Sequence, residues 1–272
     1  MIRLVGLDLD GTLLATDKSL SEENMEALRR ASAKGVHIVP VTGRPLHGLP
    51  ARVECLDFVR YAVTSNGAVV YDTAAGAAIR ERLMTPQKVL ELLDADSEEW
   101  TICEFFAGGY GYHDDRGWDY LSGRFGGKPL MNYIRRSRRR VDDLRSGILA
   151  CTAGIENFSS MSRTHEEQDR IRMRIEEIEG VNCIVPCATD LEVISADADK
   201  GTALLALAAC LGIGRSEVMA MGDGDNDYSM MQTAGLSVAV ANADAKILNA
   251  SDHVTASNDE NGVAKAICRF VL

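Results

Sequence analysis

The N-terminal segment "LVGLDLDGTLL" constrains the fold of this chain most strongly. It joins an aliphatic run to two carboxylates, Asp8 and Asp10, with Gly11 directly after them. An aliphatic run of this kind is typical of a strand that is buried in a parallel sheet. A buried carboxylate is costly unless something compensates its charge. We therefore expect that the two acids are exposed or that a cation binds them.

Strands and helices alternate in the first and last parts of the chain. Residues 21–35 predict a helix with Ser21 as its N-cap, and residues 36–43 predict a second strand. Asn66 and Gly67 lie between two apolar runs, which is typical of a hairpin turn. Toward the C-terminus, helices and strands alternate again over 200–212, 217–224, 226–235, 236–242 and 253–256. This order predicts an α/β fold with a largely parallel sheet and helices on both faces.

The middle of the chain has a different pattern. Helices are predicted at 85–99 and 164–180, and strands at 100–114, 147–155 and 181–195. A strand-rich block inside an alternating core, in a chain of 272 residues, indicates an inserted domain. We predict a core domain formed by residues 1–82 and 191–272, and an inserted α/β domain formed by residues 83–190.

Composition argues against several classes of protein. The formal net charge of −11 argues against a nucleic-acid partner, because such binding depends on basic surface. No segment reaches the roughly 18 uninterrupted apolar residues of a membrane span, and the N-terminus lacks a signal-peptide pattern. Seven scattered cysteines fit a reducing compartment, so we expect a cytoplasmic protein. Cys183 and Cys187 lack the second pair that would complete a metal site.

Four polar motifs fall at or near the carboxyl ends of the predicted strands. Asp8 and Asp10 end the first strand, "TGR" ends the second, and "GDGDND" at 222–227 follows a later one, while Lys200 opens a helix. Ligands of open parallel sheets bind beyond this edge. Each motif alone is weak evidence, but turn chemistry alone does not explain their combination. We therefore expect the motifs to form one site.

The residue types in these motifs suit phosphoryl transfer. An aspartate can act as the nucleophile and form an aspartyl phosphate. Mg²⁺ prefers oxygen ligands and would neutralise the clustered acids. Fixed positive charge from the metal and Lys200, with Thr42 and backbone amides, would stabilise the transferring phosphoryl group. The predicted cofactor is therefore Mg²⁺, and the predicted partner is a small phosphorylated metabolite.

Taken in order, "DLDGTL", "VTGR", "DKG" and "GDGDND" resemble the four signatures of the Cof-like phosphatases, subfamily IIB of the haloacid dehalogenase superfamily. The resemblance covers the whole chain. It implies a Rossmann-like core with an inserted α/β cap of the C2B type. It also implies Mg²⁺-dependent hydrolysis of small phosphomonoesters, with sugar phosphates as the favoured class.

The same resemblance implies a role for each motif residue. Asp8 would be the nucleophile, and Asp10 would be the general acid and then the general base. Asp8, the backbone carbonyl of Asp10, and Asp223 would hold Mg²⁺, with Asp227 supporting them. The substrate-binding set would be Thr42, Gly43, Arg44, Asn66, Lys200 and Asn226.

Two alternatives to a phosphatase stay open. A sugar phosphomutase would share Asp8 and Asp10 but would return the phosphoryl group to the sugar. A non-catalytic protein that binds phosphometabolites would have no need of both acids.

The inserted domain offers weaker candidates. Tyr110 and Tyr112 are the candidates for substrate contact. His47 and His113 could line the entrance to the site, but for both we favour an ordinary surface position at a helix start. The basic cluster Arg135–Arg140 could attract a phosphorylated ligand or the acidic surface of a partner, but we favour a solvated rim of the inserted domain, because no aromatic residues interrupt it.

Overall fold

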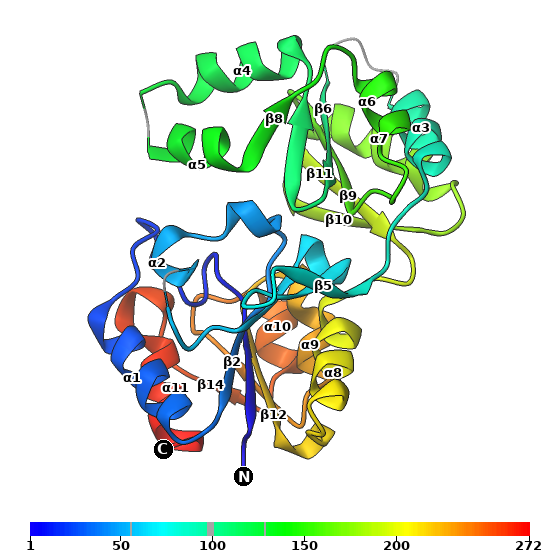
Figure 1. Ribbon diagram of the computed structural model, residues 1–272. Helices are drawn as coiled ribbons and strands as arrows, with labels where there is room; N and C mark the ends of the chain where they lie inside the picture. The colour runs from blue at the N-terminus through cyan, green and yellow to red at the C-terminus, as the bar shows by residue number, and fades with distance from the viewer. Residues whose placement is uncertain (55, 97–100, 128) are drawn as a thin grey trace. The chain divides into compact units, whose positions relative to one another are not determined.

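A computed structural model describes residues 1–54, 56–96, 101–127 and 129–272 (Figure 1). These residues form two compact units. Unit 1 comprises Met1–Gly43, Ala51–Glu81 and Asp199–Leu272, and unit 2 comprises Arg44–Pro50 and Arg82–Ala198. None of the described helices combines the length and apolar character needed to cross a membrane.

The main sheet of unit 1 has five strands, all parallel, in the order β14-β13-β12-β1-β2. β1 lies between β12 and β2, and all of its residues are buried. This arrangement confirms the predicted α/β class with its parallel sheet. The strands are β1 Leu4–Leu7, β2 His37–Pro40, β12 Val218–Gly222, β13 Leu236–Ala239 and β14 His253–Val254.

Helices lie on both sides of this sheet, with α1 and α11 on one side and α8, α9 and α10 on the other (Figure 1). The first helix begins where predicted, because the Ser21 side chain accepts a hydrogen bond from the backbone N–H of Asn24. The short helix α2 spans Ala51–Glu54. The other helices are α1 Glu22–Ala33, α8 Lys200–Cys210, α9 Tyr228–Thr233, α10 Ala245–Ala250 and α11 Gly262–Phe270.

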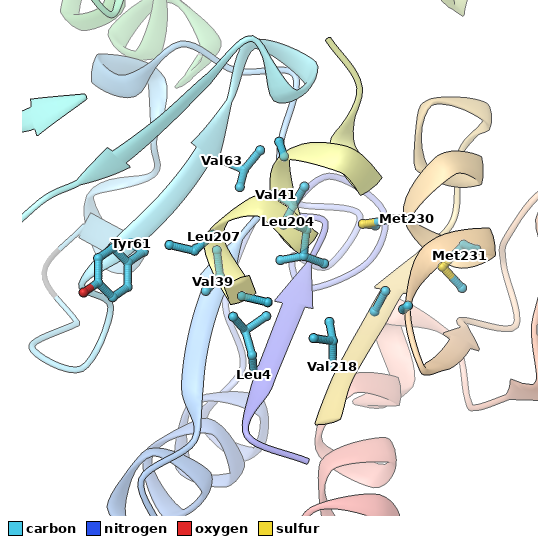
Figure 2. Close-up of a cluster of buried hydrophobic side chains, with 14 of the residues drawn as sticks. Leu4, Val39, Val41, Tyr61, Val63, Leu204, Leu207, Val218, Met230 and Met231 are labelled. Atoms are coloured by element: carbon cyan, nitrogen blue, oxygen red, sulfur yellow. The ribbon is translucent and has the colours of Figure 1, made fainter. Parts of the chain in front are cut away.

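The apolar core of unit 1 joins the sheet to α8 and α9. Leu4 and Val218 from neighbouring strands belong to one buried cluster with Leu204 of α8 and Met230 of α9 (Figure 2). Full burial of each such side chain contributes about 1.5–3 kcal/mol relative to exposure. This packing holds α8 against the sheet, with Lys200 as its first residue.

A smaller antiparallel sheet contains β3 Tyr61–Thr64, β4 Val69–Asp72 and β5 Ala77–Glu81. The turn η2, Ser65–Gly67, connects β3 to β4. Asn66 in this turn has φ 55°, a left-handed conformation that asparagine adopts more readily than most residues. The predicted hairpin is therefore confirmed.

The sheet of unit 2 has six strands in the order β10-β11-β9-β6-β7-β8. All neighbouring strands are antiparallel except β7 and β8. The two strands predicted around Gly108 and Gly109 are confirmed as β6 and β7. The strands are β6 Ile102–Ala107, β7 Tyr110–His113, β8 Arg138–Arg140, β9 Asn157–Met161, β10 Val181–Cys187 and β11 Asp190–Ser195.

The two faces of this sheet carry different side chains. Phe105, Phe158 and Leu191 lie in a buried cluster with residues of α3 Pro86–Ala95, α6 Leu144–Ala150 and α7 His165–Glu176. A second apolar cluster joins Met161 of β9 to α4 Asp115–Phe125 and α5 Pro129–Ser137. Successive strand residues point to opposite faces, so α4 and α5 cover part of the second face.

One predicted strand is wrong. Residues 147–155 begin inside helix α6, and Asp143 caps that helix by accepting from the backbone N–H of Ser146. Leu144, Ile148 and Cys151 follow the spacing of a helix face, and Ile148 is buried among α3, α7 and the sheet. The short apolar run is therefore part of a helix. Over so few residues, the spacing of apolar side chains does not distinguish a helix from a strand.

The division of the chain differs in detail from the boundaries that we predict. Strand β11 begins at Asp190 and belongs to the sheet of unit 2, so our boundary at 190/191 falls at its start. Residues Arg44–Pro50, close to the N-terminus in sequence, also group with unit 2. No sequence pattern indicated that Arg44–Pro50 groups with unit 2, because this grouping depends on contacts between residues that are distant in the chain.

Candidate active site

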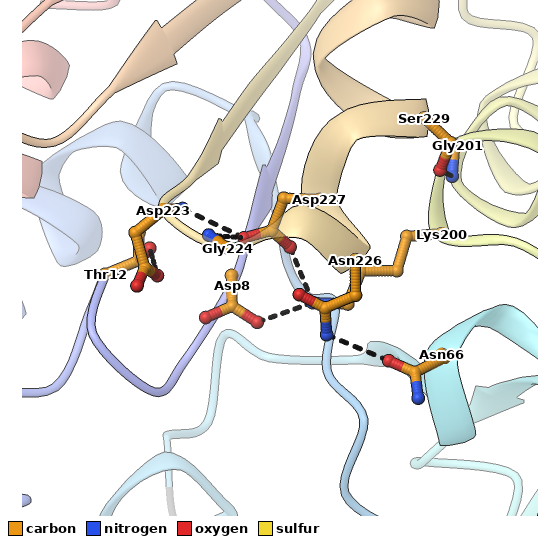
Figure 3. A network of polar contacts seen from close by, with 10 residues as sticks. All are labelled: Asp8, Thr12, Asn66, Lys200, Gly201, Asp223, Gly224, Asn226, Asp227 and Ser229. Carbon is orange, nitrogen blue, oxygen red and sulfur yellow. Dashed lines mark hydrogen bonds and ion pairs between the residues drawn. The ribbon is translucent and has the colours of Figure 1, made fainter. Parts of the chain in front are cut away.

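The centre of the polar network in unit 1 is a buried lysine between two aspartates. Lys200 Nζ donates to Asp8 Oδ1 at 2.7 Å and to Asp227 Oδ1 at 2.6 Å (Figure 3). Asp8 directly follows β1, Lys200 begins α8, and Asp227 ends the turn after β12. Three elements that are distant in sequence thus bring these charges together at the carboxyl ends of parallel strands.

The electrostatics of this trio reflect its burial. Burial raises the pKa of Asp8 well above its ordinary value, the charge of Asp227 raises it further, and Lys200 offsets part of the increase. Burial alone would lower the pKa of Lys200, but the charges of Asp227 and Asp8 raise it instead. Lys200 therefore stays protonated and supplies fixed positive charge.

A third carboxylate completes the acidic group. One oxygen each of Asp8, Asp223 and Asp227 lies within 4.8 Å of the others. Burial is the main reason why the pKa of Asp223 rises to about 6, and the Asp227 charge adds to this increase although a hydrogen bond from Thr12 opposes it. Clustered carboxylates that repel one another are a suitable donor set for a hard divalent cation such as Mg²⁺.

The hydrogen bonds distinguish the roles that the three acids can take. Asp227 Oδ2 accepts from the backbone N–H groups of Asp223 and Gly224 at 2.9 and 3.1 Å, while its other oxygen accepts from Lys200. Both oxygens of Asp227 are thus engaged, so this residue is suited to holding the loop and the lysine. Asp8 and Asp223 are better placed to offer oxygen atoms to a metal.

Asp223 is positioned by the loop after β1. Thr12 Oγ1 donates to Asp223 Oδ1 at 2.6 Å. Gly11 has φ +89°, and a Cβ atom there would lie 2.3 Å from Asp223 Oδ2. Only glycine fits this position, because a side chain would be strained and would displace the carboxylate. The sequence motif "DLDGTL" contains both residues, but our reasoning assigned neither of them a role.

Asp10 lies outside the group formed by the other three acids. Its carboxylate pairs with Lys18 Nζ at 2.9 Å, and its side chain is 36% exposed. We predict its backbone carbonyl, not its carboxylate, as a metal ligand, and a partly exposed acid can exchange protons with a leaving group and water. Sequence reasoning missed Lys18, because nothing in its neighbourhood marks it as a partner of Asp10.

The second motif and the hairpin turn are joined by hydrogen bonds. Thr42 is buried, and its backbone oxygen accepts from the backbone N–H of Asn66 at 3.0 Å. Asn226 Nδ2 donates to Asn66 Oδ1, also at 3.0 Å (Figure 3). A Cβ atom at Gly43 would lie 3.0 Å from the same Asn66 oxygen. Thr42, Gly43, Asn66 and Asn226 are thus brought together in unit 1.

Close packing between α8 and α9 supports the position of Lys200. The backbone N–H of Gly201 donates to Ser229 Oγ at 3.0 Å. A Cβ atom at Gly201 would lie 2.5 Å from the backbone oxygen of Ser229. The "KG" pair therefore has a physical basis, because the glycine allows the helices to approach and the lysine then reaches both acids.

Comparison with known proteins identifies the family. The family model of the haloacid dehalogenase-like hydrolases matches residues 5–267. The chain belongs to this family. A phosphatase from Bacillus subtilis, YxeH, whose activity is described as putative, is 31% identical over 279 residues, covering 100% of this chain and 99% of YxeH.

Other members of the haloacid dehalogenase-like family have named substrates or solved structures. The pyridoxal phosphate phosphatase YbhA of Escherichia coli is 27% identical, with 99% of each chain covered. A solved haloacid dehalogenase-like hydrolase from B. subtilis has a TM-score of 0.87 at 28% identity, covering 99% of this chain and 100% of the other. The subclass IIB sugar phosphatase BT4131 has a TM-score of 0.82 at 22% identity, with 98% of each chain covered, and shows likeness of fold. These matches confirm the predicted family, fold and assignment to phosphatases.

Arg44 differs from the other predicted residues of this hydrolase, because it belongs to unit 2. Its guanidinium lies 4.7 Å from the centre of the Tyr133 ring, and its Nη1 donates to the backbone oxygen of Gly48. These contacts hold the Arg44 side chain within unit 2, and its part in substrate binding stays a prediction.

The predicted tyrosines of unit 2 occupy different environments. Tyr110 is stacked between His47, with ring centres 3.8 Å apart, and the Arg139 guanidinium, 3.9 Å from the ring centre. Tyr112 is stacked on Phe105 at 5.0 Å and packs against the apolar cluster of unit 2. Tyr110 is the better candidate for ligand contact, because Tyr112 contributes to the core.

Our expectation for His113 is wrong, and so is the one for Arg138 within the basic cluster, whereas Arg135, Arg139 and Arg140 are exposed as expected for a solvated rim. His113 is fully buried at the end of β7, where its Nε2 lies 2.8 Å from Glu104 Oε2. Within the basic cluster, the Arg138 side chain is only 10% exposed and donates to both carboxylate oxygens of Glu104 at 3.0 Å. The guanidinium groups of Arg138, Arg139 and Arg140 lie over aromatic rings that are outside the cluster in sequence, those of Phe106, Tyr110 and Trp118. His47 is half-buried against Tyr110 instead of lying on open surface.

Proposed function

We propose that the protein is an Mg²⁺-dependent phosphatase that hydrolyses small phosphomonoesters, with sugar phosphates as the favoured class, through an aspartyl-phosphate intermediate. The observation that carries the proposal is the buried trio of Asp8, Lys200 and Asp227 beside Asp223. The names of relatives also support the proposal. YxeH, YbhA and several others are named as phosphatases, and the substrates in these names include pyridoxal phosphate and a ribitylaminouracil phosphate.

In the first step, an oxygen of Asp8 attacks the phosphorus atom of the substrate. A P–O bond forms to Asp8, and the P–O bond to the leaving alcohol breaks. Asp10 gives a proton to the departing oxygen, for which its partial exposure suits it. Lys200 already donates to Asp8 Oδ1, so its charge is in place to stabilise the phosphoryl oxygens.

In the second step, water attacks the phosphorus atom of the aspartyl phosphate. Asp10, now a carboxylate, takes a proton from this water, and the P–O bond to Asp8 breaks. Inorganic phosphate leaves and Asp8 regains its charge, so the protein returns to its starting state. Thr42, Gly43, Asn66 and Asn226 are proposed to bind the phosphoryl group and the adjacent part of the substrate.

Asp8, Asp223 and the backbone carbonyl of Asp10 would hold Mg²⁺, and Asp227 would orient this set. When bound, Mg²⁺ would neutralise charge on the clustered acids and on the phosphoryl oxygens. The donors are all oxygen atoms, which agrees with Mg²⁺ and not with the His and Cys sites typical of zinc.

We further propose that unit 2 is the cap that selects the substrate, with Tyr110 among its contacts, and that the enzyme works in the cytoplasm. The stacking of Tyr110 on His47 gives it a fixed orientation, which suits a selecting residue. The net charge of −11 argues against nucleic acid as the substrate, and a small anionic substrate requires positive charge that is concentrated locally, which Lys200 supplies between Asp8 and Asp227.

The test is a panel of phosphorylated metabolites assayed for released inorganic phosphate with Mg²⁺ and without a bisphosphate activator. We expect phosphate release from several sugar phosphates, and its loss when a chelator is added. Phosphorus NMR on the best substrate distinguishes the enzyme alternatives. A phosphatase gives free phosphate, whereas an isomeric sugar phosphate with little free phosphate would show a mutase and overturn the proposal.

A further inference from the structure

The segment Arg44–Pro50 carries the arginine of the "TGR" motif, but it groups with unit 2. The backbone N–H of His47 donates to the backbone oxygen of Gly109 at 3.0 Å, and the His47 ring stacks on Tyr110. In sequence, the segment continues directly from the residues that are proposed to bind the phosphoryl group. Contacts within unit 2 therefore determine how the last residue of this motif is held.

Tyr133 of α5 contacts the arginine at the start of this segment. The Arg44 guanidinium lies 4.7 Å from the centre of the Tyr133 ring, and a cation within about 6 Å of a ring centre is attracted to the ring face. Gly48 allows the approach, because even a Cβ atom there would lie 3.1 Å from Tyr133 Cε2. The backbone oxygen of Gly48 also accepts from Arg44 Nη1 at 3.2 Å. The ring and this carbonyl together fix the direction of the Arg44 side chain.

Arg138 in turn holds Tyr133. Arg138 Nη1 donates to the Tyr133 hydroxyl oxygen at 3.0 Å, and two other nitrogens of the same guanidinium donate to Glu104 at 3.0 Å each. Burial alone would raise the pKa of Glu104, but Arg138 and His113 lower it to about 2. Glu104 therefore stays ionised near neutral pH and keeps Arg138 in place.

A second tyrosine of unit 2 makes the same kinds of contact with an arginine of its own helix. Tyr120 of α4 packs on the same apolar cluster as Tyr133, and both side chains are half-buried. Its hydroxyl accepts from Arg124, whose guanidinium lies 5.7 Å from the centre of the ring. Tyr133 differs in that its ring contacts Arg44, a residue of a site motif.

We propose that Tyr133 is a positioning residue that orients Arg44 for substrate binding, and that the ion pair of Glu104 with Arg138 fixes Tyr133. The inference rests on the proposed phosphatase function and on the predicted part of Arg44 in substrate binding. Arginine presents a rigid fork of N–H donors that matches phosphate oxygens, so its direction matters as well as its charge. Tyr133 takes no part in the bond-forming steps, so its loss should weaken substrate binding and spare turnover.

The test is steady-state hydrolysis of one sugar phosphate by variants of the full chain with Mg²⁺. Tyr133→Leu should raise KM about tenfold, equivalent to about 1.4 kcal/mol, with kcat within about twofold of wild type, because only uniform binding is lost. Tyr133→Phe keeps the ring over which Arg44 lies and loses only the hydroxyl. Its KM should therefore rise by less than about threefold.

A double variant tests whether the tyrosine acts through the arginine. Lysine keeps the charge of Arg44 but lacks the fork, so Arg44→Lys alone should also raise KM about tenfold. Arg44→Lys combined with Tyr133→Leu should have the same KM as Arg44→Lys alone, because the second substitution then removes nothing further. A tyrosine with a merely structural role would instead add its own effect.

The matched control is Tyr120→Leu, which removes a ring and a hydroxyl that pair with Arg124. Its KM should stay at the wild-type value. Thermal unfolding of each variant checks the fold. Tyr133→Met, which also lacks a ring and suits a helix, repeats the test if Tyr133→Leu does not unfold cooperatively.

Three results would overturn the inference: a wild-type KM in Tyr133→Leu, an effect of Tyr133→Leu that adds to that of Arg44→Lys, or an equal rise of KM in Tyr120→Leu. In each of these cases the wild-type protein still releases phosphate, so the phosphatase proposal stands. Absence of phosphate release by the wild-type protein would instead overturn the proposed function, and this inference with it.

Discussion

Replacing Lys200 with Met should destabilise unit 1 strongly, because the lysine neutralises two buried acids. Its Nζ lies 2.7 Å from Asp8 Oδ1 and 2.6 Å from Asp227 Oδ1, and its side chain is 0% exposed. Removing one partner of a buried ion pair costs about 3–5 kcal/mol. Methionine has a similar length, so the loss comes from charge and not from a cavity. At about 2–4 °C per kcal/mol, we expect Tm to fall by roughly 6–20 °C.

The loss should depend on pH in a defined direction. The pKa of Asp8 is raised in the folded protein. Its contribution to stability is therefore present below its unfolded pKa and is lost as the pH rises through its folded pKa. Without Lys200 this pKa rises further, so the deficit of Lys200→Met should be largest near pH 8 and should shrink toward pH 5.

Thermal unfolding in the presence of a chelator measures this effect, and Lys246→Met is the matched control. Lys246 pairs with Asp225, but their side chains are 55% and 65% exposed, and such surface pairs contribute about 0–1 kcal/mol. The double variant Asp8→Asn with Lys200→Met should recover part of the loss, because it removes one of the unpaired charges. The reasoning is refuted if Lys200→Met costs no more than Lys246→Met, or if the double variant is less stable than Lys200→Met alone.

Three further predictions concern the metal and unit 2. The pKa of Asp223 is raised to about 6, so its contribution to the stability of the metal-free protein is lost as the pH rises through 6. Mg²⁺ should therefore raise Tm more at pH 8 than at pH 5. An equal rise in Tm at both pH values would contradict this prediction. Gly11→Ala should weaken Mg²⁺ activation by at least about tenfold, because the new Cβ would lie 2.3 Å from Asp223 Oδ2; an unchanged Mg²⁺ titration would be inconsistent with that contact. Tyr112→Ala should lower the free energy of unfolding by about 2 kcal/mol, since the ring stacks on Phe105. Tyr110→Ala should instead change the ranking of substrates more than it changes the rate with a small generic phosphoester. If this variant keeps the wild-type ranking, Tyr110 is not a specificity residue.

The sequence was most informative where local patterns determine structure. The aliphatic run before Asp8, the cap at Ser21 and the turn at Asn66 each depend on a few neighbouring residues, and the structure has the predicted element at each of them. The motifs were also predictable as a group, because the carboxyl ends of parallel strands necessarily meet at one edge. The proximity of Lys200 to Asp8 follows from that rule.

Features that depend on long-range register were not predictable. Arg138 is buried against Glu104, which lies 34 positions before it, and no local pattern indicates this meeting. The ion pair of Asp10 with Lys18 depends on the path of a loop, for which residue type gives no signal. Helix α6 was mistaken for a strand because its apolar run is too short for its period to be recognised.

The measurement that tests the central claim most directly is the trapping of the covalent intermediate on Asp8. The enzyme with Mg²⁺ is mixed with a sugar phosphate that it hydrolyses, quenched in acid within one turnover, and digested for mass spectrometry. We predict one added phosphoryl group on the peptide of the wild-type protein that contains Asp8. The Asp8→Asn variant should form no such adduct, and its turnover should stay below about a hundredth of wild type. Its thermal unfolding should remain cooperative, which shows that the fold is intact. Phosphate release by Asp8→Asn at a rate near that of wild type, or a phosphoryl group on a different residue, would contradict the account.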